Sequence, residues 1–187
     1  MALQDTFTRA LEQGVAESPA TVPLSSMVCL LNEYFQYAQR TCKTVEEIEN
    51  KMSKLGVDAG RPLWTYVRML DRMRLKTQDT VCRLTRPDTV LYYLKETVWP
   101  ILFGKPAADI KKPATEDLEY YLVDEWPVLE YYTSYPPNYG GALPSMFVAG
   151  LVEGFLTCCG FRTKILAYNV LDEPNPNITF HISFTKP

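Results

Sequence analysis

The stretch 143–161, LPSMFVAGLVEGFLTCCGF, decides how this chain folds. Its bulky apolar residues recur at positions 147, 148, 151, 152, 155, 156 and 159, which is the spacing of a helix with a wide apolar stripe. Pro144 suits the first turn of such a helix, and Gly160 suits a left-handed C-cap. Small residues stand among the large ones, so that another backbone can approach closely: Ala149, Gly150 and Gly154.

Two interpretations of this helix are open, a buried core helix and a membrane span. About 18 residues between the caps nearly suffice to cross a bilayer. The glycines and Glu153 in the middle of the segment argue against a span, and neither flank has a pronounced excess of Lys or Arg. We therefore interpret 143–161 as the central helix of a soluble core, with strands following it.

Composition and length indicate a single domain. The chain has 187 residues, of which 47% are apolar and 12% aromatic, enough for a sizeable core. The net charge of −3 gives no reason to expect a nucleic acid partner. Residues 1–23 are polar and lack a continuous apolar run, so we expect an N-terminal arm and linker, not a signal peptide, with a helix over 5–14. The folded domain is then expected to occupy 24–187.

Helical periodicity dominates the first half of that domain. One helix is expected from Ser25, as its cap, to about Thr41, and its apolar residues form one stripe: Met27, Leu30, Leu31, Tyr34, Phe35 and Ala38. The capping box Thr44-x-x-Glu47 begins a second helix, which we expect to stop at Gly56 or Gly60.

Prolines and a glycine mark the next boundaries. Pro62 is expected to open a third helix, running through Leu70, and Pro87 a fourth, which Pro100 kinks and Gly104 ends. The charged segment 105–117 is expected to be a loop.

Strand-like segments follow on both sides of the central helix. Segments 119–124 and 128–133 are rich in aromatic and branched residues, and 163–170 and 178–184 are joined by a hairpin-like connection. Apolar and polar residues alternate in the last segment and place His181 on its polar face. We therefore predict an α+β fold, in which helices pack on one face of a four-stranded twisted antiparallel sheet.

The residues that catalysis requires do not come together in the sequence. The chain has a single histidine and no G-x-S-x-G motif, so it lacks the serine nucleophile that a histidine base would activate. It also has no Walker loop for binding phosphate. Five cysteines without a C-x-x-C pair favour small buried thiols over a zinc site. Strand alternation should split the one carboxylate cluster between two faces: Glu116, Asp117, Glu119, Asp124 and Glu125. We therefore expect no enzyme activity, catalytic residue, cofactor or metal.

A basic stretch over 68–86 has two interpretations. Its first four cations are Arg68, Arg72, Arg74 and Lys76. They form either a solvated helix face and loop, or a surface attracted to an anionic membrane, where each nearby cation contributes about 1 kcal/mol.

Two motifs resemble a known family. The segment 95–105, KETVWPILFGK, and the pattern F-x-A-G-x-V-E-x-x-L-T-x-x-G-F over 147–161 are similar to the small subunits of the transport protein particle, TRAPP, and within that family to the subunit 5 branch. The likeness runs over about 24–168. It implies a scaffold subunit of a vesicle-tethering complex, which when assembled exchanges guanine nucleotide on a Rab-type GTPase in ER–Golgi traffic. It also implies a cytoplasmic location peripheral to Golgi and ER membranes.

The resemblance implies partners and candidate site residues as well. Paralogous small subunits are the expected partners, above all subunit 3 and subunit 2, together with the Rab-type GTPase through the complex. Family members pack the helix over 25–41 on the same helix of a paralogue, so the candidate interface residues are Met27, Leu31, Tyr34 and Phe35. The alternative is that all four belong to the core of this chain.

One paralogue, subunit 3, carries a fatty acyl chain on a cysteine in the region of Cys82. The spacing from Cys82 to Gly104 differs from that of the paralogue, so acylation and an ordinary thiol both remain open. The alternative function is a small-molecule domain, with a lipid in an apolar tunnel along the glycine-rich helix at 143–161.

Overall fold

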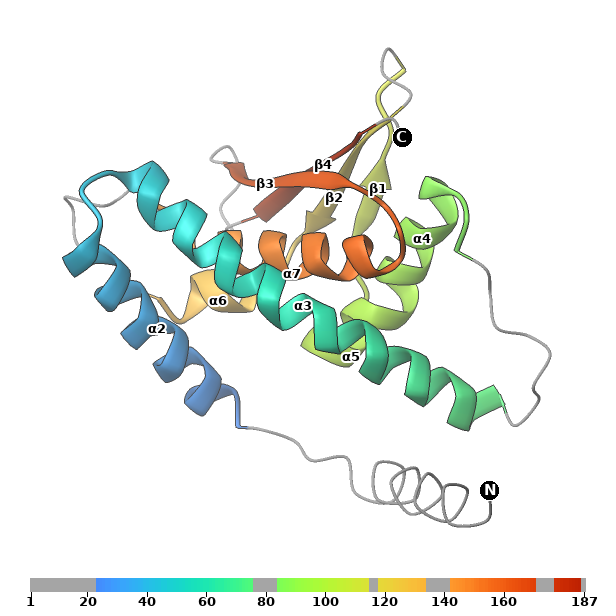
Figure 1. The fold of residues 1–187 in the computed structure, drawn as a ribbon, viewed down its shortest axis with the longest axis horizontal. Helices are drawn as coiled ribbons and strands as arrows, with labels where there is room; N and C mark the ends of the chain where they lie inside the picture. Colours follow the sequence, from blue (N-terminus) through green and yellow to red (C-terminus); the bar gives the residue numbers. More distant parts are fainter. Residues whose placement is uncertain (1–22, 76–83, 115–117, 134–141, 171–176, 186–187) are drawn as a thin grey trace.

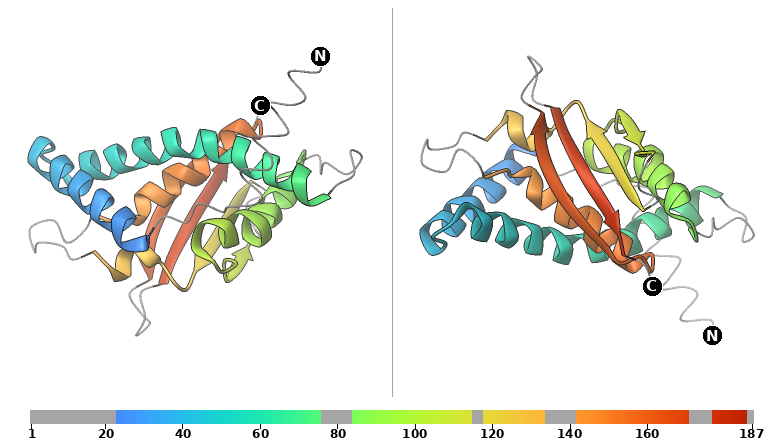
Figure 2. Two further views of the ribbon diagram at one scale, coloured as in Figure 1. Left: turned by 90° about the horizontal axis from the view of Figure 1, so that it is seen from below. Right: turned by 90° about the horizontal axis from the view of Figure 1, so that it is seen from above.

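The computed structural model of the protein describes residues 23–75, 84–114, 118–133, 142–170 and 177–185. Within these ranges the chain forms two layers, with helices packed on one face of an antiparallel sheet (Figure 1). Figure 2 shows that no described helix covers the other face of the sheet. The predicted α+β architecture is therefore confirmed.

The sheet has four strands in the order β1-β2-β4-β3. Their bounds are Asp109–Lys111 for β1, Glu119–Asp124 for β2, Thr163–Val170 for β3 and Asn177–Phe184 for β4. In the central strand β4, every second side chain is buried, as the alternating sequence predicts. Phe180 faces Leu122 of β2 on one side and Ala167 of β3 on the other, so the three strands present one continuous apolar face to the helices.

One predicted strand is wrong, and one strand was missed. Val128–Tyr131 is a short helix, α6, because Pro127 starts a helical turn whose carbonyl accepts a hydrogen bond from the Glu130 N–H at 3.0 Å. The missed strand, β1, lies in the segment expected to be a loop. A three-residue strand with charged ends is typical of a sheet edge, and it gives almost no periodic signal.

Helix α7, Ser145–Cys158, is the predicted central helix, and a single long helix lies across it. That helix, α3, spans Val45–Leu75 and contains Pro62, so the two helices expected on either side of Gly60 are one. The correction has a physical reason, which is that the glycines of α3 serve a helix–helix contact and do not end the helix.

Four glycines bring the backbones of α3 and α7 into direct contact. Each helix carries a G-x-x-x-G pair, Gly56 and Gly60 on α3 and Gly150 and Gly154 on α7. A Cβ added to Gly56 would overlap the Phe147 carbonyl oxygen, and one added to Gly60 would overlap that of Leu151. A Cβ on either α7 glycine would meet an α3 carbonyl in the same way. The pairing therefore leaves no space for side chains at the crossing.

The helix starts are fixed by polar groups. Half of the predicted capping box is present, because the Glu47 N–H donates to Thr44 Oγ1 at 3.2 Å. The Glu47 carboxylate accepts from the N–H of Lys43 at 2.8 Å, one residue before the cap. Helix α7 is capped from α6, because Glu130 Oε1 accepts from both the N–H and the hydroxyl of Ser145. Helix α2, Leu24–Thr41, starts one residue before the expected cap and has no side-chain cap.

The fourth predicted helix is present but irregular. It consists of α4 (Pro87–Tyr93), a π-helical turn η1 (Leu94–Val98) and α5 (Trp99–Phe103). The ring of Pro100 has no N–H to donate, and the turn that precedes it widens. Gly104 ends the helix with a φ of 76°, the left-handed conformation expected of a glycine cap.

Candidate partner-binding surface

Helix α2 carries more apolar surface than the chain itself covers. Successive residues turn by about 100°, so residues three or four apart share a face. One row packs into the core, namely Val28, Leu31, Phe35 and Ala38. A second row lies beside it, namely Met27, Leu30, Tyr34 and Tyr37, and we call this row the α2 stripe. Leu30 is 71% exposed and Tyr37 is 53% exposed.

The four residues proposed from the sequence divide between these two rows. Leu31 and Phe35 are 7% and 4% exposed, so they belong to the core of this chain. Met27 and Tyr34 lie on the α2 stripe, where Tyr34 also packs against the core and its ring centroid lies 6.1 Å from that of Tyr37. Sequence reasoning missed Leu30 as an exposed residue, although it continues the spacing from Met27.

The basic residues are placed only in part. Arg68 Nη1 lies 3.9 Å from Asp71 Oδ2, and its guanidinium lies 5.1 Å from the centroid of the Trp64 ring. Arg68 is therefore engaged within its own helix. Arg72 and Arg74 lie in the last turn of α3, and Lys76 lies outside the described residues. A membrane-facing role for this group stays a prediction.

The carboxylates and the histidine are also distributed as alternation predicts. Glu119 and His181 share the open face of the sheet, where His181 Nε2 lies 2.9 Å from Glu119 Oε2 and its ring stacks on Tyr121. Asp124 is buried and Glu125 is exposed. Glu116 and Asp117 lie outside the described residues. Within the described ranges, no three His, Cys, Asp or Glu side chains form a group that could hold a metal.

Cys82, the candidate for acylation, lies outside the described residues. At the end of α7, Cys158 is exposed, whereas burial raises the pKa of the neighbouring Cys159 thiol to about 12. At pH 8, the reactive thiolate fraction of Cys159 should be about a thousandfold below that of an ordinary cysteine.

We therefore expect iodoacetamide at pH 8 to alkylate Cys158 well before Cys159 in the folded chain, as followed by mass spectrometry of the labelled peptides. The raised pKa also means that the folded state holds this proton more tightly than the unfolded state does. The corresponding stability should be complete below about pH 9 and be lost as the pH rises toward 12. Equal labelling rates for the two thiols in the folded protein would contradict this assignment.

Comparison with known proteins places the chain in a family. A family model described as "Transport protein particle (TRAPP) component" matches residues 27–185. The chain belongs to the TRAPP component family. Among the described helices of this TRAPP chain, none combines the length and the apolar content that a bilayer span requires.

Curated TRAPP relatives agree with the subunit 5 likeness. Trafficking protein particle complex subunit 5 of Dictyostelium discoideum is 32% identical over 165 residues, covering 88% of this chain and 83% of the relative. The Homo sapiens subunit 5 is 28% identical, covering 89% and 87%. Subunit 31 of Saccharomyces cerevisiae is 23% identical, and the match covers 82% of this chain and 52% of that protein.

A solved TRAPP structure has the same fold. It is the crystal structure of trafficking protein particle complex subunit 3 from Naegleria fowleri covalently bound to palmitic acid. Its TM-score to this chain is 0.70 at 12% identity, over 87% of this chain and 95% of the other.

Proposed function

We propose that this chain is a non-catalytic scaffold subunit of a vesicle-tethering TRAPP complex. In the assembled complex it supports guanine-nucleotide exchange on a Rab-type GTPase in ER–Golgi traffic, on the cytoplasmic side of Golgi and ER membranes. The expected neighbours are the paralogous subunits 3 and 2. The support comes from family membership and from the subunit names of the relatives.

The observation that carries the proposal is the uncovered α2 stripe. Met27, Leu30 and Tyr37 are exposed in the isolated chain at 38%, 71% and 53%. Burying a large apolar side chain stabilises an assembly by roughly 1.5–3 kcal/mol, so a row of such side chains favours association. Because the stripe adjoins residues that pack in the core, a partner helix seated there would extend the core without a gap.

The test replaces two exposed stripe residues with charged ones. Leu30→Glu plus Tyr37→Glu should weaken binding to co-expressed subunit 3 by at least about a hundredfold, because two carboxylates would have to be buried against apolar side chains. Copurification and titration of the separated proteins measure the change. The melting temperature should stay close to that of the wild type, because both side chains are exposed in the chain alone.

The matched control places two glutamates on the polar face of the same helix. Ser25→Glu plus Gln36→Glu changes two exposed positions outside the stripe and should leave the affinity within about threefold. Wild-type affinity in the stripe variant, with the fold intact, would exclude α2 as the site of attachment. Equal loss in both variants would show that added charge is responsible and the stripe is not.

The alternative function, a lipid tunnel along the glycine-rich helix, has less support. The subunit 3 neighbour was solved with palmitic acid, which keeps the idea worth testing by native mass spectrometry. In this chain, however, Gly150 and Gly154 face carbonyl groups of α3. The close contact between α7 and α3 thus explains why α7 contains these two glycines, and they are not evidence for a lipid tunnel.

A further inference from the structure

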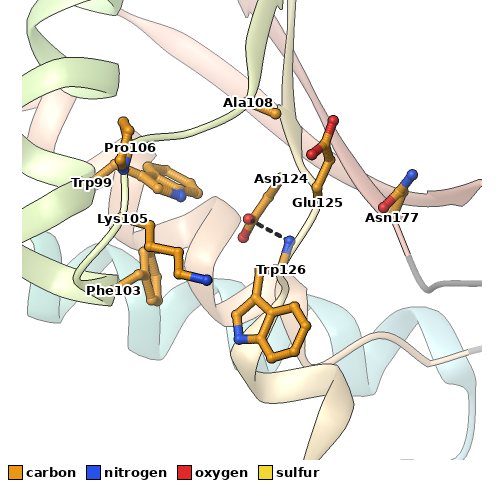
Figure 3. A pocket seen from close by; sticks show the side chains of 9 residues that line it. All are labelled: Trp99, Phe103, Lys105, Pro106, Ala108, Asp124, Glu125, Trp126 and Asn177. Carbon is orange, nitrogen blue, oxygen red and sulfur yellow. Dashed lines mark hydrogen bonds between the residues drawn. The ribbon is translucent and has the colours of Figure 1, made fainter.

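A pocket of about 400 Å³ opens beside the end of β2 (Figure 3), and no residue of α2 lines it. It lies between the end of α5 and the first residue of β4, Asn177. Three aromatic side chains line it, Trp99, Phe103 and Trp126, and Asp124 points in among them. An aromatic wall around a carboxylate is an arrangement that suits an organic cation.

The carboxylate of Asp124 is a buried charge with weak local compensation. Its side chain is 8% exposed, and Oδ1 accepts a hydrogen bond from the Trp126 backbone N–H at 3.1 Å. Burial raises the pKa of Asp124, while the Trp126 N–H and the Trp99 indole act in the opposite direction. Within the described part of the chain, no cation lies within ion-pair distance of Asp124. A buried charge of this kind is costly until a counter-ion arrives.

The indole of Trp99 adds a second polar group to the pocket. Trp99 is 1% exposed, and its Nε1 has no hydrogen-bond partner in the described residues. It turns toward the Asp124 carboxylate (Figure 3), and its N–H dipole partly offsets the rise in the pKa of Asp124 that burial causes. The N–H should therefore be sensitive to any ligand that approaches the carboxylate.

Lys105 shows that the pocket already attracts a cation. Its Nζ lies 5.1 Å from the centroid of the Trp126 ring, yet the ion pairs among the described residues do not join it to Asp124. With Glu125 on the rim, the formal charges of the lining sum to one negative charge, from Lys105 against two carboxylates. Lys105 is exposed, and a lysine side chain has a flexible four-carbon stem. Its ammonium group can therefore move away when a ligand binds more tightly.

We propose that this pocket binds the guanidinium group of an arginine side chain on a partner protein. A guanidinium is planar, so it can stack on Trp126 and offer two parallel N–H donors to Asp124. A lysine ammonium is not planar and cannot offer two parallel N–H donors to one carboxylate. The proposal rests on the proposed function in one respect, which is that an associated subunit supplies the arginine.

The experiment follows the indole N–H signals of the full chain by ¹H–¹⁵N NMR during titration with N-acetyl-arginine amide. The chain has three tryptophans, and Trp64 lies outside the pocket, so it serves as an internal reference. The signals of Trp99 and Trp126 should shift and saturate with a dissociation constant on the order of millimolar, while Trp64 stays in place. N-acetyl-citrulline amide, which has the same shape without the charge, should bind at least about tenfold more weakly.

Three variants assign the effect to named groups. Asp124→Asn keeps an oxygen for the Trp126 N–H and removes a costly buried charge, so it should fold and weaken arginine amide by at least about tenfold. Asp109→Asn, the matched control at an exposed carboxylate that does not line the pocket, should change the affinity by less than about threefold. Lys105→Ala should strengthen binding, since it removes a competing cation.

Equal binding of the citrulline compound, or no shift at Trp99 and Trp126, would overturn the proposal. So would equal losses in Asp124→Asn and Asp109→Asn. These outcomes are distinguishable from failure of the proposed function, because the titration contains no partner subunit and the α2 stripe variants leave the pocket unchanged. If Asp124→Asn did not fold, the comparison of the two amides on the wild-type chain would still decide.

Discussion

Gly150→Ala is expected to remove a large share of the folding stability of the chain. The added methyl group would overlap the backbone carbonyl of Ser53, and a helix backbone cannot turn aside as a flexible side chain can. Relief requires α3 to move away from α7 along the whole crossing, which also separates the side chains packed around it, such as Trp64 on Phe155. We expect a loss of about 3 kcal/mol or more, a large share of the 5–15 kcal/mol typical of a domain.

Denaturant unfolding of the purified chain measures this loss, and Gly104→Ala provides the control. Gly104 has a φ of 76°, and nothing lies within 4 Å of an added Cβ, so the control carries backbone strain of about 1–2 kcal/mol and no clash. If Gly150→Ala unfolded at the same denaturant concentration as the wild type, the close contact of the two helices would be wrong. Gly154→Ala should behave like Gly150→Ala, because its Cβ meets the Val57 carbonyl.

Leu31→Glu plus Phe35→Glu is expected to detach α2 from the rest of the chain, whether or not a partner is present. Both side chains are buried, so each glutamate must either lose its hydration or pull the helix into water. Each substitution also removes a large apolar contact, for a combined cost of several kcal/mol.

Hydrogen exchange and limited proteolysis of the isolated chain check this result. Amide protection across α2 should disappear, while β4 and α7 remain protected if the remaining core survives. The exposed pair on the same helix, Leu30→Glu plus Tyr37→Glu, is the matched comparison and should retain protection. Protection in α2 that is equal in both variants would show that Leu31 and Phe35 are not core residues. Comparing the two variants also separates loss of binding from loss of folding. The buried pair alone could not do so, because unfolding of α2 would itself abolish binding.

Much of the fold follows from local patterns. The central helix can be predicted because a long apolar run with helical spacing lies between Pro144 and Gly160, and most of its side chains are buried in the core. Strand β4 can be predicted because strict alternation of apolar and polar residues is typical of a half-buried strand. Where a residue serves two purposes, the local pattern misleads. Gly56 and Pro62 are usual boundary signals, yet α3 continues through both because it is held along α7.

The candidate sites show the same division. The α2 stripe could be found from residue spacing, since Met27, Leu30 and Tyr34 follow the helical repeat. Which of two adjacent apolar rows faces inward depends on where α2 lies against the core, and the sequence of α2 does not contain that information. The pocket around Asp124 was missed altogether, because it is assembled from the ends of α5, β2 and β4. No short motif links Trp99 to Asn177.

The α2 stripe also affects the abundance of this chain in a cell. A copy that finds no companion leaves Leu30 and its neighbours in water, where chaperones and proteases select such segments. We expect surplus copies to be short-lived, and a pulse-chase in cells depleted of the companion should show a shorter half-life. The supply of the companion, and not the synthesis of this chain, would then set its abundance.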